Sequence, residues 1–172
     1  MPCCKRYMAA KVYSPMLNWD VIAWKDLSRD ALYEILALRA EVFVVEQDCP
    51  YQDVDGKDAN SLHVVAWSSA DYANSTRRAL AYTRIVFPGG SYAEPSIGRV
   101  VTAAEVRGQG VGVELMRRSI TACQRHFPGQ PIRISAQSYL EKFYVELGFV
   151  PTGKTYLEDG IPHLEMLLAG AG

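Results

Sequence analysis

The chain has 172 residues, 49% of them apolar, and a formal net charge of −1 at pH 7. This length and composition fit a single domain with one sizeable core. The sequence shows no block of basic residues for nucleic acid and no apolar run as long as a membrane span, so we expect neither kind of partner.

The N-terminal residues and the cysteines bear on domain organisation and cellular location. Residues 1–18 have no clear periodicity, and we interpret them as an extension that precedes one domain at 19–172. The four cysteines lack the spacing of a metal site, so we expect reduced thiols and no bound metal. The N-terminus also lacks the apolar core of a signal peptide, and we therefore expect a cytoplasmic protein.

Alternating and helical patterns define the first elements. A short strand is predicted within 19–27, where Val21, Ala23 and Lys25 alternate with Ile22 and Trp24. Ser28 can cap a helix that begins near Arg29. Apolar residues at helical spacing mark one face of this helix, namely Leu32, Ile35, Leu36, Val42 and Phe43.

Arg39 falls on the same apolar face, seven residues after Leu32. An arginine there needs a partner or a water-filled cleft. Two interpretations stay open: its head group reaches solvent at the edge of the stripe, or it lines a substrate cleft. The acids of the following loop, 49–61, cap turns or present negative charge to a cationic amine. Their spacing does not fit a calcium loop.

A glycine-rich turn at 107–112 is the most informative stretch. Strands are predicted before it at 62–67, 79–87 and 97–102, and an amphipathic helix follows it to about His126. Glycines allow a tight turn and close ligand approach, and the first amides of a helix are unpaired and partly positive. Strand, turn and helix together predict an anion site, most commonly for a phosphate.

The rest of the chain completes the fold class. We predict a strand at 132–136, a short helix at 139–147, and strands at 149–157 and 163–168. Strands alternate with helices in the centre, while both ends are rich in strands. This arrangement predicts an α/β protein of the α+β kind, with a mixed, mostly antiparallel central sheet flanked by helices on both faces.

A second glycine-containing run, 148–155, matches the P-loop of nucleotide triphosphatases letter for letter. A P-loop requires a strand before it and a helix after it. Here a helical pattern precedes the run, and the residues after it cannot start a helix. The match therefore does not predict a nucleotide triphosphatase.

Two motifs resemble one enzyme superfamily. Arg107, Gly110 and Gly112 fit the pattern Arg/Gln-x-x-Gly-x-Gly, which between a strand and a helix resembles the coenzyme A loop of the GNAT N-acetyltransferases. The run 143–149 resembles the second motif of that superfamily, and 42–56 and 158–163 resemble its ElaA branch. The resemblance extends over about 19–168. It implies a GNAT-like domain that transfers an acetyl group from acetyl-CoA to the primary amine of a small-molecule or peptide acceptor.

The resemblance also assigns a coenzyme site. The pyrophosphate would bind the amides of the glycine turn, and the pantetheine arm would pair with the preceding strand like an added strand. Gln137 stands where the superfamily often has an asparagine that contacts the coenzyme. The residues assigned to the coenzyme are Val100, Val101, Thr102, Arg107, Gly108, Gln109, Gly110, Val111, Gly112, Val113 and Gln137.

Acyl transfer to an amine requires two proton movements. An amine of pKa near 10.4 is almost entirely protonated at pH 7, so a base must take its proton, directly or through water. The leaving thiolate gains a proton, which a tyrosine phenol can supply. The resemblance indicates Tyr144 as this acid; the alternative is a core aromatic with a satisfied hydroxyl. Glu46, Glu105 and His163 are the candidate bases.

Other functions stay open. Arg39, Glu46 and His163 are candidate substrate-binding residues. A coenzyme-binding domain of this fold without turnover is one alternative function. Another is an acyl-homoserine lactone synthase, which Arg39, Phe43, Asp53 and Asp55 loosely resemble. The sequence predicts no particular oligomeric state.

Overall fold

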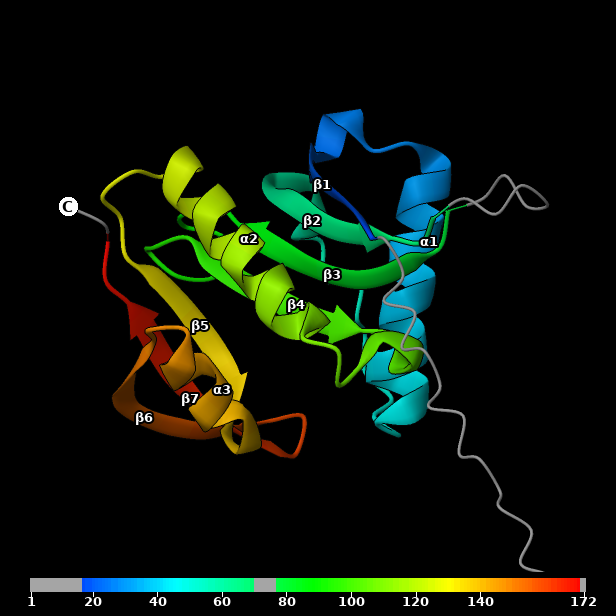
Figure 1. Ribbon diagram of the computed structural model, residues 1–172. Helices are drawn as coiled ribbons and strands as arrows, with labels where there is room; N and C mark the ends of the chain where they lie inside the picture. Colours follow the sequence, from blue (N-terminus) through cyan, green and yellow to red (C-terminus); the bar gives the residue numbers. More distant parts are fainter. Residues whose placement is uncertain (1–16, 70–76, 171–172) are drawn as a thin grey trace, which may run out of the picture.

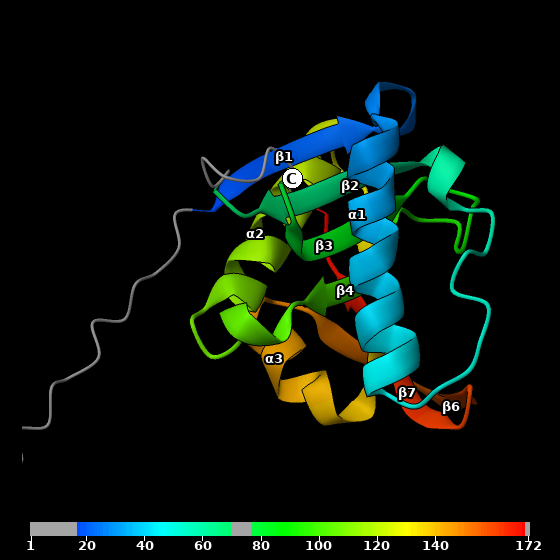
Figure 2. The same cartoon turned by 90° about the vertical axis from the view of Figure 1, so that its right-hand side faces the viewer.

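The protein is described by a computed structural model that covers residues 17–69 and 77–170. Seven strands form one sheet in the order β1-β2-β3-β4-β5-β7-β6 (Figures 1 and 2). Only the β4–β5 pair is parallel, and the other neighbouring pairs are antiparallel. The predicted mixed, mostly antiparallel sheet is therefore confirmed.

The elements lie close to their predicted positions. The strands are β1 (Asn18–Ala23), β2 (Ser61–Trp67), β3 (Ala79–Val86), β4 (Ser96–Thr102), β5 (Ile132–Gln137), β6 (Val150–Glu158) and β7 (Ile161–Leu168). The helices are α1 (Arg29–Arg39), α2 (Val111–His126) and α3 (Glu141–Glu146), with the π-helix η2 (Ala40–Glu46) directly after α1. Short 3₁₀ turns are η1 (Trp24–Asp26), η3 (Asp58–Asn60), η4 (Ala104–Val106) and η5 (Ser138–Leu140).

The N-terminal boundary and the first helix start can be compared with the sequence. The expected extension falls on residues that the structure does not describe, apart from its last two. Leu17 packs against the core and Asn18 begins β1, so these two belong to the domain. Ser28 caps α1, since its hydroxyl accepts a hydrogen bond from the Ala31 amide at 3.1 Å. The first strand starts one residue before the predicted region 19–27 and ends at Ala23, where the chain turns into η1.

The helices cover both faces of the sheet, as predicted. Tyr82 and Thr83 are neighbours in β3 and therefore point to opposite faces. The Arg39 guanidinium of α1 lies 5.7 Å from the centre of the Tyr82 ring, and the Thr83 hydroxyl contacts the Ser119 hydroxyl of α2 at 2.6 Å. Figure 2 shows the same arrangement, with α1 on one side of the strands and α2 and α3 on the other.

The sheet opens between β4 and β5. The two strands are paired only at Ser96 and Arg133. On its other side, β4 carries a bulge against β3, because three steps from Val101 to Gly98 match two steps from Tyr82 to Arg84. A bulge bends its strand and increases the local twist. The bend directs the rest of β4 away from β5 and leaves a gap between the two strand edges.

Two sequence patterns can be judged against this fold. Thr155 lies inside β6, so a strand rather than a helix follows the P-loop-like run 148–155. None of the helices within 17–69 and 77–170 is both long enough and apolar enough to span a membrane.

Candidate active site

A cavity of about 420 Å³ lies in the gap between β4 and β5. Val100 and Thr102 line it from β4, and Ser135 and Gln137 line it from β5. The gap interrupts the sheet and therefore opens toward both of its faces. Side chains from the elements on both faces complete the cavity wall. They include Val42, Phe43, Glu46, Gln47, Cys49, Tyr51, Arg99, Arg107, Tyr139, Leu140, Tyr144, Glu158, Asp159, Ile161 and His163.

The glycine turn forms the N-terminus of α2, as the sequence predicts. Gly110 caps the helix with φ 78°, and Gly108 also has a positive φ, 71°. This left-handed conformation favours glycine. The first intrahelical bond runs from the Glu114 amide to the Gly110 carbonyl at 3.1 Å. The amides of 111–113 therefore make no hydrogen bond within the helix, and a helix start of this kind can bind an anion.

The strand residues assigned to the coenzyme separate into two groups. Val100 and Thr102 line the cavity, whereas Val101 is 3% exposed and packs in the core. This follows from the alternation of side chains along a strand. Because β4 and β5 diverge beyond their single pair, the backbone of β4 facing the gap is available to an extended ligand. Gln137 faces the same gap from the end of β5.

Arg107 connects the glycine turn to the end of η2. Its guanidinium pairs with both carboxylate oxygens of Glu46 at 2.6 and 2.8 Å and donates to the Thr102 carbonyl at 3.1 and 3.0 Å. These hydrogen bonds lower the pKa of Glu46. A carboxylate that is engaged on both oxygens is a weaker candidate for a base than one that is free.

Tyr144 comes from α3 and lines the cavity while only 5% exposed. Its ring packs edge-on against Phe143 and Phe149, with centroids 5.0 and 6.0 Å apart. Among the described residues its hydroxyl has no hydrogen-bond partner. Burial raises the pKa of Tyr144 above its usual range, so the phenol carries its proton at neutral pH.

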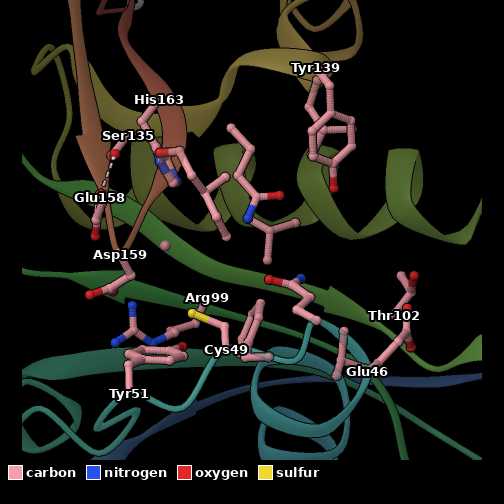
Figure 3. Close-up of a pocket in the computed structure, with 18 of the residues that line it drawn as sticks. Glu46, Cys49, Tyr51, Arg99, Thr102, Ser135, Tyr139, Glu158, Asp159 and His163 are labelled. Carbon is pink, nitrogen blue, oxygen red and sulfur yellow. Dashed lines mark hydrogen bonds between the residues drawn. The ribbon is translucent and has the colours of Figure 1, made fainter.

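His163 is the candidate base that the structure places best. Its Nδ1 lies 2.8 Å from the Ile161 carbonyl, which can only accept a hydrogen bond, so Nδ1 carries the proton and Nε2 is an acceptor. The ring stacks on Tyr156 at 15° between planes. The Tyr156 hydroxyl donates to Ser135 Oγ at 2.6 Å, and Ser135 Oγ donates to Glu158 at 2.9 Å (Figure 3).

Two further candidates, Glu105 as a base and Arg39 as a substrate-binding residue, lie outside the cavity. Glu105 is not part of the cavity wall and pairs with Arg78 at 3.1 Å. Arg39 is fully buried and also lies outside the wall. Both of its sequence interpretations required an exposed or solvated head group. Instead Arg39 pairs with Asp53 and Asp58, each at 2.8 Å.

These ion pairs belong to a larger buried network. Arg84 pairs with Asp55 and Asp58, and Arg99 pairs with Asp53 and Asp55. Removing one member of such a network leaves a buried charge uncompensated and typically costs about 3–5 kcal/mol. The acids of the loop 49–61 thus bind arginines of α1, β3 and β4, and they fix this loop against the sheet.

Arg99 is a cavity residue that the sequence did not reveal. It occupies the bulge of β4 with φ 53°, which is unusual for a residue with a side chain. Its guanidinium lies 5.5 Å from the centre of the Tyr51 ring, and both residues line the cavity. Gly98 just before it was the only local sign that the strand is irregular.

The site therefore combines an anion-binding helix start, a gap that can accept an extended chain, a buried phenol and a histidine with a free nitrogen. Within the described ranges no group of three or more His, Cys, Asp or Glu side chains could hold a metal ion. This combination suits the transfer of an acyl group from a phosphate-bearing thioester carrier.

Comparisons with known proteins agree with this geometry. Residues 28–169 match the family described as "Acetyltransferase (GNAT) domain". The chain is 39% identical to the protein ElaA of Escherichia coli over 153 residues, 88% of this chain and 95% of that protein. The crystal structure of E. coli ElaA has a TM-score of 0.80 at 38% identity, over 89% of this chain and 99% of that chain.

An acyl-CoA N-acyltransferase from Pseudomonas aeruginosa has a TM-score of 0.81 at 42% identity, over 89% of this chain and 99% of that chain. The chain belongs to the GNAT acetyltransferase family, and its resemblance to the ElaA branch is confirmed. Membership supports acyl-CoA-dependent acyl transfer. The acyl-homoserine lactone synthase BjaI, solved with SAM and isopentyl-CoA, has a TM-score of 0.68 at 17% identity over 91% of this chain and 84% of that chain, and this likeness shows the fold alone.

Proposed function

We propose that the protein is an N-acetyltransferase that moves an acetyl group from acetyl-CoA to the primary amine of a small-molecule or peptide acceptor. One observation carries the proposal: the unpartnered hydroxyl of the buried Tyr144 lies in the wall of the same cavity as the gap between β4 and β5. The side chain is held in place by burial, while its hydroxyl is not fully shielded and has no partner among the described residues. A fixed proton donor of this kind, in a cavity that suits an acyl carrier, fits a role in the reaction.

The coenzyme would enter along the gap. Its pyrophosphate would bind the amides of Gly108–Val113, where the helix dipole favours negative charge. The pantetheine arm would pair with the free edge of β4 beside Val100 and Thr102, and the Gln137 amide could donate to or accept from it. Arg107 would exchange part of its contact with Glu46 for the phosphate, because a phosphate offers the same bidentate geometry.

His163 would act as the base and Tyr144 as the acid. The protonated amine gives a proton to Nε2 of His163, directly or through one water. The neutral amine then attacks the thioester carbonyl and forms the new C–N bond. When the C–S bond breaks, the Tyr144 hydroxyl donates a proton to the leaving thiolate, and the excess proton on the amide nitrogen passes to solvent. Before the next turnover, Tyr144 recovers its proton from solvent and His163 releases to solvent the proton that it took from the amine.

Replacement of Tyr144 by Phe tests this proposal. The change keeps the ring and its packing on Phe149 and removes only the proton donor. General acid catalysis is typically worth about 10²–10⁴-fold. Because a coenzyme A thiolate is a fairly good leaving group, we expect turnover to fall about 100-fold while coenzyme affinity stays within a few-fold. Turnover is measured as thiol release at saturating amine, and coenzyme affinity is measured by titration. A thermal melt of the same preparation measures stability.

Tyr33→Phe is the matched control, because Tyr33 is 73% exposed on α1 and is not a wall residue. Equal turnover in Tyr144→Phe would exclude Tyr144 from the mechanism. A fall in turnover with an equally large loss of stability would favour a core aromatic. A wild-type protein that binds acetyl-CoA but releases no thiol with any amine would favour a binding module without turnover.

A further inference from the structure

The acceptor side of the cavity carries two carboxylates. Figure 3 shows Ser135, His163, Glu158 and Asp159 together on one side of the cavity, away from Thr102. Arg107 of the glycine turn donates a hydrogen bond to the Thr102 carbonyl. The coenzyme would therefore occupy the side of the cavity where Thr102 lies. Glu158 ends β6, Asp159 lies in the turn to β7, and both line the cavity wall. An amine bound at His163 would share the cavity with both carboxylates.

The basic side chains of the cavity wall are already engaged. Arg107 is paired with Glu46, and Arg99 is paired with Asp53 and Asp55. The buried network behind Arg99 contains three arginines and three aspartates, so its formal charges cancel. Its arginines therefore supply no surplus positive charge to a neighbouring acid.

Glu158 and Asp159 have no such compensation. Glu158 accepts a hydrogen bond from Ser135, which is neutral, and across residues 17–69 and 77–170 neither carboxylate has an ion-pair partner. Lys154, which is also in β6, pairs with Glu165 instead. An entering acceptor therefore meets two uncompensated negative charges. Tyr144 lies in the wall of the same cavity and is only 5% exposed, and its hydroxyl has no hydrogen-bond partner among the described residues; it independently indicates that a ligand belongs in this cavity.

We propose that the acceptor is a small primary amine with a second cationic group, such as an α,ω-diamine, and that Glu158 and Asp159 bind this distal cation. The inference rests on the proposed acyl transfer and adds the substrate class. An anionic acceptor is disfavoured, because its charge would face both carboxylates and would find Arg99 already paired.

The ladder between β6 and β7 sets the length of such an amine. His163 pairs with Tyr156, and Glu158 lies two residues further along the same face of β6. Glu158 is thus a diagonal neighbour of His163, and such neighbours are roughly 7–8 Å apart. A diamine with a short aliphatic chain spans this distance, with one amine at His163 and the other at Glu158.

The first experiment compares three acceptors with the same carbon chain, using the purified full-length protein and acetyl-CoA. Putrescine has a second cation, butylamine has none, and γ-aminobutyrate has an anion instead. We expect kcat/KM for putrescine to exceed that for butylamine roughly tenfold, because each of the two ion pairs contributes a factor of a few and the two factors multiply. We expect γ-aminobutyrate to be the poorest acceptor. High salt should reduce the preference for putrescine, since ions screen exposed charges.

The second experiment removes the charges one at a time. Glu158→Gln keeps an oxygen that accepts from Ser135, and Asp159→Asn keeps a turn sequence, Asn-Gly, that suits the positive φ of 49° at this position. Each variant should lower the ratio of putrescine to butylamine kcat/KM roughly 2- to 5-fold. Asp26→Asn removes an exposed charge from η1, outside the cavity wall, and should leave this ratio unchanged.

The outcomes separate this inference from the proposed function. Equal efficiency with putrescine and butylamine, a preference for γ-aminobutyrate, or ratios that the two variants do not alter would overturn the diamine inference and leave acyl transfer standing. A clear preference for lysine peptides over putrescine would replace it with a peptide acceptor. Absence of thiol release with every amine would overturn both.

Discussion

At the scale of single residues, the two nitrogens of His163 have different tasks. Nδ1 is held by the Ile161 carbonyl, and the ring is supported by Tyr156. The ring orientation is therefore fixed, and Nε2 is left to accept a hydrogen bond or a proton. A histidine that only filled space would not require a fixed tautomer, whereas a base that acts through water does.

We expect His163→Asn to lower turnover about 10- to 100-fold at neutral pH. The asparagine amide can still donate to the Ile161 carbonyl, so the change removes Nε2 and keeps the backbone contact. The defect should shrink as the pH rises toward the pKa of the acceptor amine, near 10.4, because more of the amine is then already neutral. Rates from pH 7 to 10 for wild type and variant measure this.

His126→Asn is the control, since His126 lies at the C-terminal end of α2 and outside the cavity wall. A defect in His163→Asn of the same size at every pH would indicate a structural role for the ring and would leave the base unassigned.

Local conformation was predictable where the deciding contacts are local in the sequence. The glycine turn and its helix lie next to one another in the chain, and the pattern predicted the start of α2 directly. Arg39 shows the opposite case. Its partners Asp53 and Asp58 are 14 and 19 residues away, in a loop without periodicity. The pattern showed that Arg39 needed a partner or a water-filled cleft, and it could not show which of the two applies, because the partners lie far away in the sequence.

At the scale of elements, α2 is bounded by two glycines with similar backbone conformations. Gly110 precedes its first turn with φ 78°, and Gly129 follows its last turn with φ 74°. A Cβ at either position would meet no atom within 4 Å, so only the left-handed backbone disfavours a side chain there. The two ends differ in what they can bind, because the N-terminal end attracts anions and the C-terminal end does not.

We expect Gly110→Glu to abolish coenzyme binding, because the new carboxylate would occupy and repel the phosphate site. Gly129→Glu is the matched control, with the same added charge and a similar backbone cost at the other end of α2. Each should lower the free energy of unfolding by about 1–2 kcal/mol. Coenzyme titration and denaturant unfolding of both variants measure these effects. Similar coenzyme affinities in the two folded variants would show that the turn is not the site.

Two irregular elements shape the cavity and were not predictable from periodicity. The bulge at Arg99 opens the gap between β4 and β5, and an alternating pattern contains no information on one unpaired residue. The π-helix η2 continues α1 and presents Val42, Phe43 and Glu46 to the cavity. Its apolar residues also fit an ordinary helix, so the sequence predicted the helix but not its change of pitch.

At the scale of the whole molecule, the order of the strands assembles the site. The glycine turn follows β4, Tyr144 follows β5, and His163 lies in β7, which inserts between β5 and β6. The predicted antiparallel character was correct, and the tight turn between β6 and β7 allows no other pairing of these two strands. The insertion of β7 was not predictable from local patterns, since it depends on pairing between strands that are distant in the chain.

The same architecture predicts which nucleotide-bearing ligand stabilises the fold. Acetyl-CoA can place its pyrophosphate on the start of α2 and its pantetheine arm in the gap, so it should bind the folded state alone. At about 100 times its dissociation constant it should add about 2.7 kcal/mol to the free energy of unfolding. For a domain of this size each kcal/mol raises Tm by about 2–4 °C, which gives a shift of about 5–10 °C in a thermal melt.

ATP with magnesium should give no comparable shift, although the run 148–155 has the letters of a P-loop. Gly148 follows α3, and the residues from Val150 onward pair with β7 as the strand β6, so their amides do not form a phosphate-binding turn at a helix start. ATP also has no pantetheine arm to fill the gap between β4 and β5. Melts with each ligand, repeated with Gly110→Glu, test both parts: the acetyl-CoA shift should vanish in the variant. A shift with ATP and none with acetyl-CoA would move the anion site from α2 to β6 and refute the proposed coenzyme site.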